Sequence, residues 1–213
     1  MTPLYWLAWS TSRLLFLNLF RCRVYHPERV PLTGPVILAA NHESYFDPPF
    51  IGSSLPRPIN YLAREDLFSN RLSGPFLRGL NSVPVDRGGG GARGLKNILE
   101  RLLNGDAILI FPEGTRTHDG EMKAAQAGIG LAILRSQAPV VPVRVWTYNA
   151  YGRHHAVPRM ATTAVKFGHP IRFDSMRDRA GICPRPELRT LYQQATEETM
   201  AAITNLRPIT DDA

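Results

Sequence analysis

Short apolar runs recur along the chain, bounded by proline, glycine, asparagine or aspartate. Each is five or six residues long, the length of a strand and too short for most helices. Runs with so few polar positions are typical of strands covered on both faces of a sheet. They predict strands at residues 36–40, 59–63, 107–111, 140–145 and 164–168.

Helical spacing appears between these runs. Apolar residues three and four positions apart predict an amphipathic helix over 92–104, and Asn104-Gly105 is a typical helix end. Similar patterns predict helices at 75–80, 128–135 and 186–205. Alternating strands and helices of this kind predict an α/β fold: a single domain with a mixed, mostly parallel sheet flanked by helices. In such folds, ligands bind in a crevice at the ends of the strands.

Residues 4–20 form the most apolar stretch of the chain. As a helix they would be about 25 Å long, shorter than a hydrocarbon core of about 30 Å. Arg13 near the middle would cost roughly 2.5–3.5 kcal/mol in a spanning helix. Trp6 and Trp9 favour the lipid headgroup level, so we expect an interfacial, membrane-associating helix. The alternative is a helix packed on the protein's own core.

Charge narrows the class of partner. The net charge is +7 and the pI is near 9.8, which favours an anionic partner. The basic residues are spread along the chain, and no zinc-finger, RNA-recognition or basic-zipper pattern is present. We therefore expect an anionic membrane surface or a phosphorylated small molecule and no nucleic acid. Cys22 and Cys183 are too few for a disulfide framework and lack metal-site spacing.

A histidine and a carboxylate follow the run at 36–40. His42 and Asp47 are five positions apart, so on one continuous helix they would point about 140° away from each other. Asp47-Pro48 is typical of a helix start, with aspartate as the N-cap and proline at the first position. A turn there would fold Asp47 back onto the His42 ring and fix its tautomer. The alternative is that Asp47 only caps a helix and His42 is a polar loop residue.

Four ordered motifs give the pair a context. Asn-His-x4-Asp at 41–47 is followed by Val-Asp-Arg at 85–87, Phe-Pro-Glu-Gly-Thr-Arg at 111–116 and Val-Pro-Val at 141–143. Together, in this order, they closely resemble the glycerolipid acyltransferases, whose best-known members are the lysophosphatidate (1-acylglycerol-3-phosphate) acyltransferases. The resemblance covers roughly residues 35–170.

The resemblance implies transfer of a fatty acyl group from a thioester, acyl-CoA or acyl carrier protein, to a hydroxyl of lysophosphatidate. The product would be phosphatidate, in phospholipid biosynthesis. It implies no cofactor beyond the acyl donor and no metal. We expect a peripheral or monotopic enzyme on the cytoplasmic face of the cell membrane, with residues 1–25 as the membrane-associating helix and 26–213 as the acyltransferase domain.

The resemblance also assigns roles to residues. His42 would be the general base and Asp47 would orient it. The acceptor's phosphate would be held by Arg116 and Arg87, with Arg64 helping. Glu113 would accept a hydrogen bond from a glycerol hydroxyl or hold Arg116 in place. Gly114 and Thr115 would let backbone and hydroxyl donors approach the substrate.

The sequence departs from the family pattern in two places. Asn81 stands where a glycine usually precedes the Val-Asp-Arg strand, and we expect it to adopt the left-handed backbone that the turn needs. A family Phe-Lys-x-Gly segment is replaced by residues 125–128, which keep only the glycine, so Lys123 is left as the nearby lysine. The glycine run at 88–91 lacks the ending of a P-loop and is expected to be a plain loop.

Several alternatives stay open. The acceptor could be glycerol-3-phosphate, another lysophospholipid or a lyso-aminolipid, and the sequence specifies neither the acyl donor nor the chain length. A serine hydrolase would need a Gly-x-Ser-x-Gly elbow, which the sequence lacks. A non-catalytic membrane-binding module that keeps the fold is the remaining class, and the intact His-Asp pair and Glu-Gly-Thr-Arg motif count against it.

Overall fold

A computed structural model describes residues 2–85, 92–117, 122–126, 128–146 and 163–207. Within them the strands form one sheet in the order β1-β7-β6-β2-β5-β3-β4. Neighbouring strands are parallel throughout, except that β6 and β7 are antiparallel. The mostly parallel mixed sheet is therefore confirmed. The strands are β1 (Arg23–Tyr25), β2 (Val36–Ala40), β3 (Asn60–Arg64), β4 (Ser82–Val85), β5 (Ala107–Ile110), β6 (Val140–Trp146) and β7 (Ala164–Phe167).

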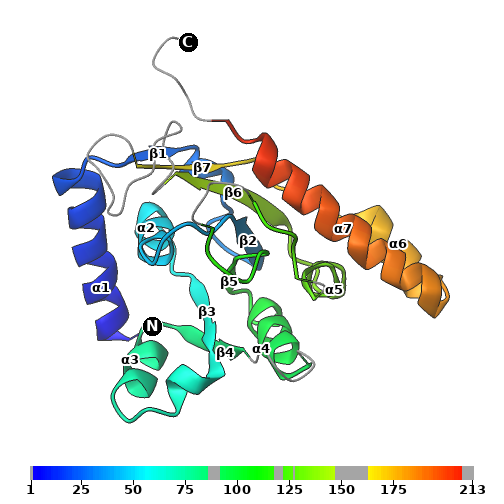
Figure 1. The fold of residues 1–213 in the computed structure, drawn as a ribbon, viewed down its shortest axis with the longest axis horizontal. Helices are drawn as coiled ribbons and strands as arrows, with labels where there is room; N and C mark the ends of the chain where they lie inside the picture. Colours follow the sequence, from blue (N-terminus) through cyan, green and yellow to red (C-terminus); the bar gives the residue numbers. More distant parts are fainter. Residues whose placement is uncertain (1, 86–91, 118–121, 127, 147–162, 208–213) are drawn as a thin grey trace.

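The central strand β2 explains the continuous apolar runs. Every residue of β2 is buried, and Leu38 is in register with Leu109 of β5 and Val141 of β6. Helices cover both faces of the sheet, so neither set of alternating side chains meets water. Figure 1 shows α1 on one side of the sheet and α6 and α7 on the other. The helices are α1 (Pro3–Arg13), α2 (Asp47–Ser54), α3 (Ser73–Gly79), α4 (Ala92–Leu103), α5 (Ile129–Arg135), α6 (Asp174–Ile182) and α7 (Arg185–Asn205).

Each face of the sheet packs against its own apolar cluster. On one face, Phe16 and Phe50 pack with ring centroids 5.2 Å apart beneath α1 and α2. On the other, α4, α5 and α7 contribute residues such as Ile98, Ile133 and Leu191. The sequence pattern did not predict α6 or β1.

Two predicted turns have the expected backbone. Asn81 has φ +58° and Gly105, just after α4, has φ +80°. Asparagine at position 81 therefore does adopt the left-handed conformation that glycine usually supplies, as we expected.

The N-terminal segment has one buried and one exposed face. After α1 the chain continues as a π-helix over Leu14–Leu19. Tyr5 and Phe16 are each only 2% exposed, whereas Leu7 and Leu14 are 66% and 64% exposed. The Arg13 guanidinium donates to the carbonyl of Ser53 in α2. Packing on the core is thus confirmed for one face, and the other leaves apolar side chains uncovered.

No helix in the described part of the chain is long and apolar enough to cross a bilayer. Residues 23–25 form β1 and pair with β7, so this part of the N-terminal segment belongs to the main sheet.

Candidate active site

His42 and Asp47 meet in the loop that follows β2. The His42 Nδ1 and Asp47 Oδ2 atoms are 2.8 Å apart, and the Asp47 side chain is completely buried. The same Oδ2 accepts 2.7 Å hydrogen bonds from the backbone N–H groups of Glu43 and Ser44. Because a carboxylate only accepts, Nδ1 carries the ring proton and Nε2 is left with a free lone pair. The ring is thereby held in the tautomer that a general base requires.

Our expectation that Asp47 is the N-cap of a helix was wrong in its geometry. The helix α2 begins at Asp47 itself, with Phe46 at the cap position. The carboxylate turns back to the N–H groups of the preceding loop instead of capping those of the helix. This backward turn is what brings it to the histidine.

Phe111 fixes the plane of the His42 ring. The two rings are stacked with centroids 3.9 Å apart and planes 18° from parallel. The His42 side chain keeps 16% exposure, enough for a substrate atom to reach one edge. Sequence reasoning placed Phe111 in a strand motif and did not identify this contact.

Glu113 ties the two motif loops together. Its Oε1 accepts from the His42 backbone N–H at 3.1 Å, and its Oε2 accepts from the Lys123 backbone N–H at 2.9 Å. The residue is 1% exposed. Thr117 adds another contact between the same two loops, because its backbone N–H donates to the His42 carbonyl at 2.8 Å. We expected Glu113 to contact a glycerol hydroxyl or to hold Arg116. Both of its oxygens instead bind backbone groups, so it positions His42.

Arg116 is held by an aromatic residue that the sequence analysis missed. Its guanidinium carbon lies 3.5 Å from the centroid of the Tyr45 ring, and Nη2 donates to the Tyr45 hydroxyl at 2.7 Å. Cation–π stacking of this kind orients an arginine and leaves its other N–H donors free. Tyr45 is three residues after His42, so the two motifs meet here a second time. The only sequence signal was an aromatic residue inside the first motif.

The remaining motif residues of this loop are Gly114 and Thr115. Gly114 has φ +65°, and a Cβ there would crowd the side chain of Gln126. Glycine is therefore required for the turn that follows Glu113. Thr115 is exposed and could present its hydroxyl to a ligand.

Of the two other predicted phosphate ligands, the structure describes only Arg64, whose guanidinium is bound elsewhere. Arg64 ends β3 and its guanidinium binds Asp66, with Nε 2.9 Å from Oδ1, in an exposed ion pair. This ion pair lies at the start of the 3-10 helix Glu65–Phe68. Arg87 lies outside the described residues.

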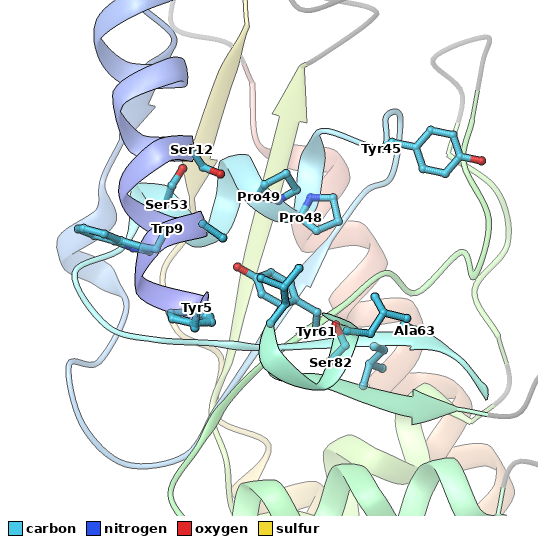
Figure 2. Close-up of a pocket in the computed structure, with 14 residues that line it drawn as sticks. Tyr5, Trp9, Ser12, Tyr45, Pro48, Pro49, Ser53, Tyr61, Ala63 and Ser82 are labelled. Carbon is cyan, nitrogen blue, oxygen red and sulfur yellow. The ribbon is translucent and has the colours of Figure 1, made fainter. Parts of the chain in front are cut away.

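An apolar pocket of about 360 Å³ adjoins the His42 loop. Its walls come from α1, the start of α2, β3, α3 and β4. In Figure 2, Pro48 and Pro49 face Tyr61 across the pocket, whereas the Tyr45 ring points away from it. Burial raises the pKa of Tyr5 and of Tyr61, so both hydroxyls stay neutral. The pocket suits an acyl chain better than a charged group.

A half-buried arginine, Arg144, offsets negative charge behind the site. Burial lowers the pKa of Arg144, whereas attraction to Glu43 and Glu113 raises it. Two buried carboxylates thus have a positive group nearby. Among the described residues, no group of three or more histidine, cysteine or acidic side chains is placed to hold a metal ion.

A family model described as "Acyltransferase" matches residues 21–146, which is more than half of the chain. The chain is 32% identical over 121 residues to a 1-acyl-sn-glycerol-3-phosphate acyltransferase of Bacillus subtilis (strain 168), covering 56% of this chain and 60% of that protein. It is 28% identical over 112 residues to a lyso-ornithine lipid O-acyltransferase of Pseudomonas aeruginosa, covering 52% of this chain and 43% of that protein. The matches therefore span about half of these relatives' lengths.

The fold also resembles a solved structure. The crystal structure of the 1-acyl-sn-glycerophosphate acyltransferase PlsC from Thermotoga maritima superimposes with a TM-score of 0.66 at 22% sequence identity. The match covers 96% of this chain and 81% of that one. At this identity the likeness supports the α/β fold described above.

Proposed function

Since the chain belongs to the acyltransferase family, we propose that it moves a fatty acyl group from an acyl thioester to the free hydroxyl of lysophosphatidate, forming phosphatidate. The observation that carries this proposal is the His42–Asp47 pair at 2.8 Å, in a loop that also contacts Arg116 and borders an apolar pocket. These are a base, a cation for a phosphate and a space for an acyl chain.

The reaction needs one proton transfer in each direction. Nε2 of His42 takes the proton of the acceptor hydroxyl as its oxygen attacks the thioester carbonyl, and Asp47 stabilises the imidazolium that forms. The C–S bond then breaks, the thiolate leaves, and the imidazolium returns the proton to sulfur. A thioester is already activated, so no covalent enzyme intermediate is required. General base catalysis of this kind typically contributes 10²- to 10⁴-fold.

Thiol release from purified protein tests the proposal. Acyl-CoA or acyl carrier protein thioester is mixed with a panel of acceptors, and free thiol and acylated product are both measured. Release that depends on lysophosphatidate, with phosphatidate as the product, is the expected result. Release without any acceptor would indicate a hydrolase, and no release with any pair would indicate a non-catalytic binding module.

A second acceptor class belongs in the same panel. The Pseudomonas aeruginosa relative is named for acylating lyso-ornithine lipid, whose headgroup is an amino acid and not a phosphate. Faster turnover with a lyso-aminolipid than with lysophosphatidate would indicate that the lyso-aminolipid is the preferred acceptor. The two thioesters, offered separately, identify the acyl donor.

Arg116 is expected to determine acceptor affinity. Charge-assisted hydrogen bonds contribute roughly 1.5–3 kcal/mol, so Arg116→Ala should raise the acceptor KM roughly 10- to 100-fold. Arg116→Lys should recover only part of this, because an ammonium lacks the planar fork that binds phosphate in two places. The measurement is steady-state kinetics with lysophosphatidate varied at saturating thioester. If neither variant changes the acceptor KM, the phosphate of the acceptor is bound by other residues.

Tyr45 is expected to act through Arg116. Removing the ring and its hydroxyl in Tyr45→Ala should raise the acceptor KM several-fold, since a cation–π contact contributes about 0.5–1 kcal/mol at exposed sites. Tyr45→Phe keeps the ring and should lose less. In an Arg116→Ala background the Tyr45→Ala effect should vanish, which a double-mutant cycle measures. An effect of equal size in both backgrounds would contradict this coupling.

We also propose a peripheral location on the cytoplasmic face of a membrane, supported by the exposed apolar face of the first helical segment. Changing Leu7 and Leu14 together to serine should weaken binding to anionic vesicles at least about tenfold, because each buried leucine contributes roughly 1.5–3 kcal/mol. Both side chains are largely exposed, so the melting temperature should hardly change. Co-sedimentation across a salt series measures the partition. Equal sedimentation of variant and parent would contradict the assignment of this helix.

A further inference from the structure

A second set of exposed apolar side chains lies around α3. Leu67, Leu72 and Phe76 are 44%, 85% and 52% exposed. They belong to a short segment that runs from the 3-10 helix Glu65–Phe68 through a turn into α3. We call these three residues the α3 surface. The motifs and the chemistry described above make no use of it.

The α3 surface is presented by an ordered turn. The Asn70 side chain accepts from the Leu72 backbone N–H at 2.9 Å, and the Ser73 hydroxyl donates to the Leu67 carbonyl at 2.6 Å. Gly74 is buried so closely against the Phe68 carbonyl that a Cβ there would overlap it. Leu72 is therefore held outward in a defined turn, with 85% of its surface exposed. Such exposure of large apolar groups is typical of interaction sites.

The α3 surface is joined to α1 and to the apolar pocket. The Thr2 hydroxyl donates to the carbonyl of Gly79 at the end of α3, and a Cβ at Gly79 would overlap the Leu4 side chain. Figure 1 shows α3 beside the N-terminal end of α1. Leu77 and Leu80 line the same pocket as Trp9. The pocket thus has exposed apolar side chains on the helices at two of its walls.

The charge around the α3 surface is positive. Arg71 and Arg78 are exposed and form no ion pair with any residue that the structure describes. The acidic residues of the neighbouring 3-10 helix are already paired, Asp66 with Arg64 and Glu65 with Arg93. Apolar side chains beside unpaired arginines complement an anionic bilayer surface, where each basic residue contributes about 1 kcal/mol.

We infer that the α3 surface docks on an anionic phospholipid bilayer together with the exposed face of α1. Both helices that wall the pocket would then rest on the lipid, and a lipid chain would reach the pocket without crossing water. The inference deepens the proposed function and rests on it for the lipid substrate. Docking is measured without turnover, so the docking inference and the proposed function can be contradicted independently of each other.

The first test compares two matched double variants of the full chain. Leu72→Ser with Phe76→Ser should lower partition onto phosphatidylglycerol–phosphatidylcholine vesicles at least tenfold. The control, Leu103→Ser with Ile182→Ser, removes side chains that are 85% and 89% exposed on α4 and α6, and should change it less than twofold. Thiol release with a dispersed short-chain acceptor should be unchanged in both. Equal partition of the two double variants would overturn the inference.

The second test reports directly on contact. A Leu72→Cys variant, in a Cys183→Ser background, carries an environment-sensitive fluorophore, since the remaining Cys22 is only 7% exposed. A blue shift on adding anionic vesicles, reduced by high salt and small with pure phosphatidylcholine, is expected. The same label at Ile182→Cys should not shift. No shift at position 72 with any vesicle would overturn bilayer docking and leave a protein partner as the occupant of the α3 surface.

Discussion

Replacing His42 by alanine is expected to lower kcat at least about 100-fold. Nδ1 of the ring is bound to Asp47 at 2.8 Å, which leaves Nε2 available as the base. Without it, neither the acceptor hydroxyl nor the leaving thiol has a proton carrier. Steady-state turnover with saturating thioester and acceptor measures the loss.

The matched control is His169→Ala, which removes an exposed histidine elsewhere on the described surface. It should turn over like the parent. His42→Ala also removes a partner of buried Asp47, so its melting temperature must be recorded with its activity. A folded His42→Ala protein with near-normal turnover would show that His42 is not the general base.

Glu113→Ala is expected to lower the free energy of unfolding by roughly 3 kcal/mol or more. Two hydrogen bonds to a buried carboxylate are lost, each contributing about 1.5–3 kcal/mol, and the His42 and Lys123 N–H groups lose their partners. For a protein of this size the melting temperature should fall by at least about 6 °C. Turnover should fall as well, because the His42 backbone is no longer held.

Glu113→Gln separates positioning from substrate contact. The amide has one acceptor where two N–H donors must be met, so one donor faces another whichever way the group is turned. We expect kcat to fall with little change in the acceptor KM, whereas Glu100→Gln, on the exposed face of α4, should change neither. A large rise in acceptor KM with normal kcat and stability would show that Glu113 binds the acceptor substrate directly.

Much of the fold could be predicted because the apolar runs have strand length and separate helical patterns. β2 and β5 were predicted within one residue, since their neighbours on both faces are apolar and local pattern and burial agree. β1 and α6 could not be predicted, because β1 has only three residues and α6 buries none of its residues. Without an apolar period, neither leaves a signal in the sequence.

The sequence predicted which residues belong to the site better than it predicted the contacts between them. The turn expected at Asp47-Pro48 suggested the pairing of His42 with Asp47, although Asp47 begins the helix and does not occupy its cap position. Glu113 could not be placed from sequence, because a carboxylate that binds two backbone N–H groups has no side-chain partner to identify it. Tyr45 was missed for a related reason: stacking on Arg116 joins residues that are 71 positions apart and depends on how two loops face each other.

The central position of β2 has a consequence for the newly made chain. Its neighbours β5 and β6 both come later in the sequence, and β6 ends at Trp146. At roughly 5–20 residues per second, the ribosome would deliver this last neighbour several seconds or more after β2. Throughout that time an entirely apolar strand has an open edge, and Asn41, beside His42, lacks the two hydrogen bonds that it forms with the backbone of Val145. Non-local pairing of this kind makes folding slow and exposes the chain to aggregation. A nascent chain stalled before Val140 should therefore be held by chaperones, and one released after β6 should not.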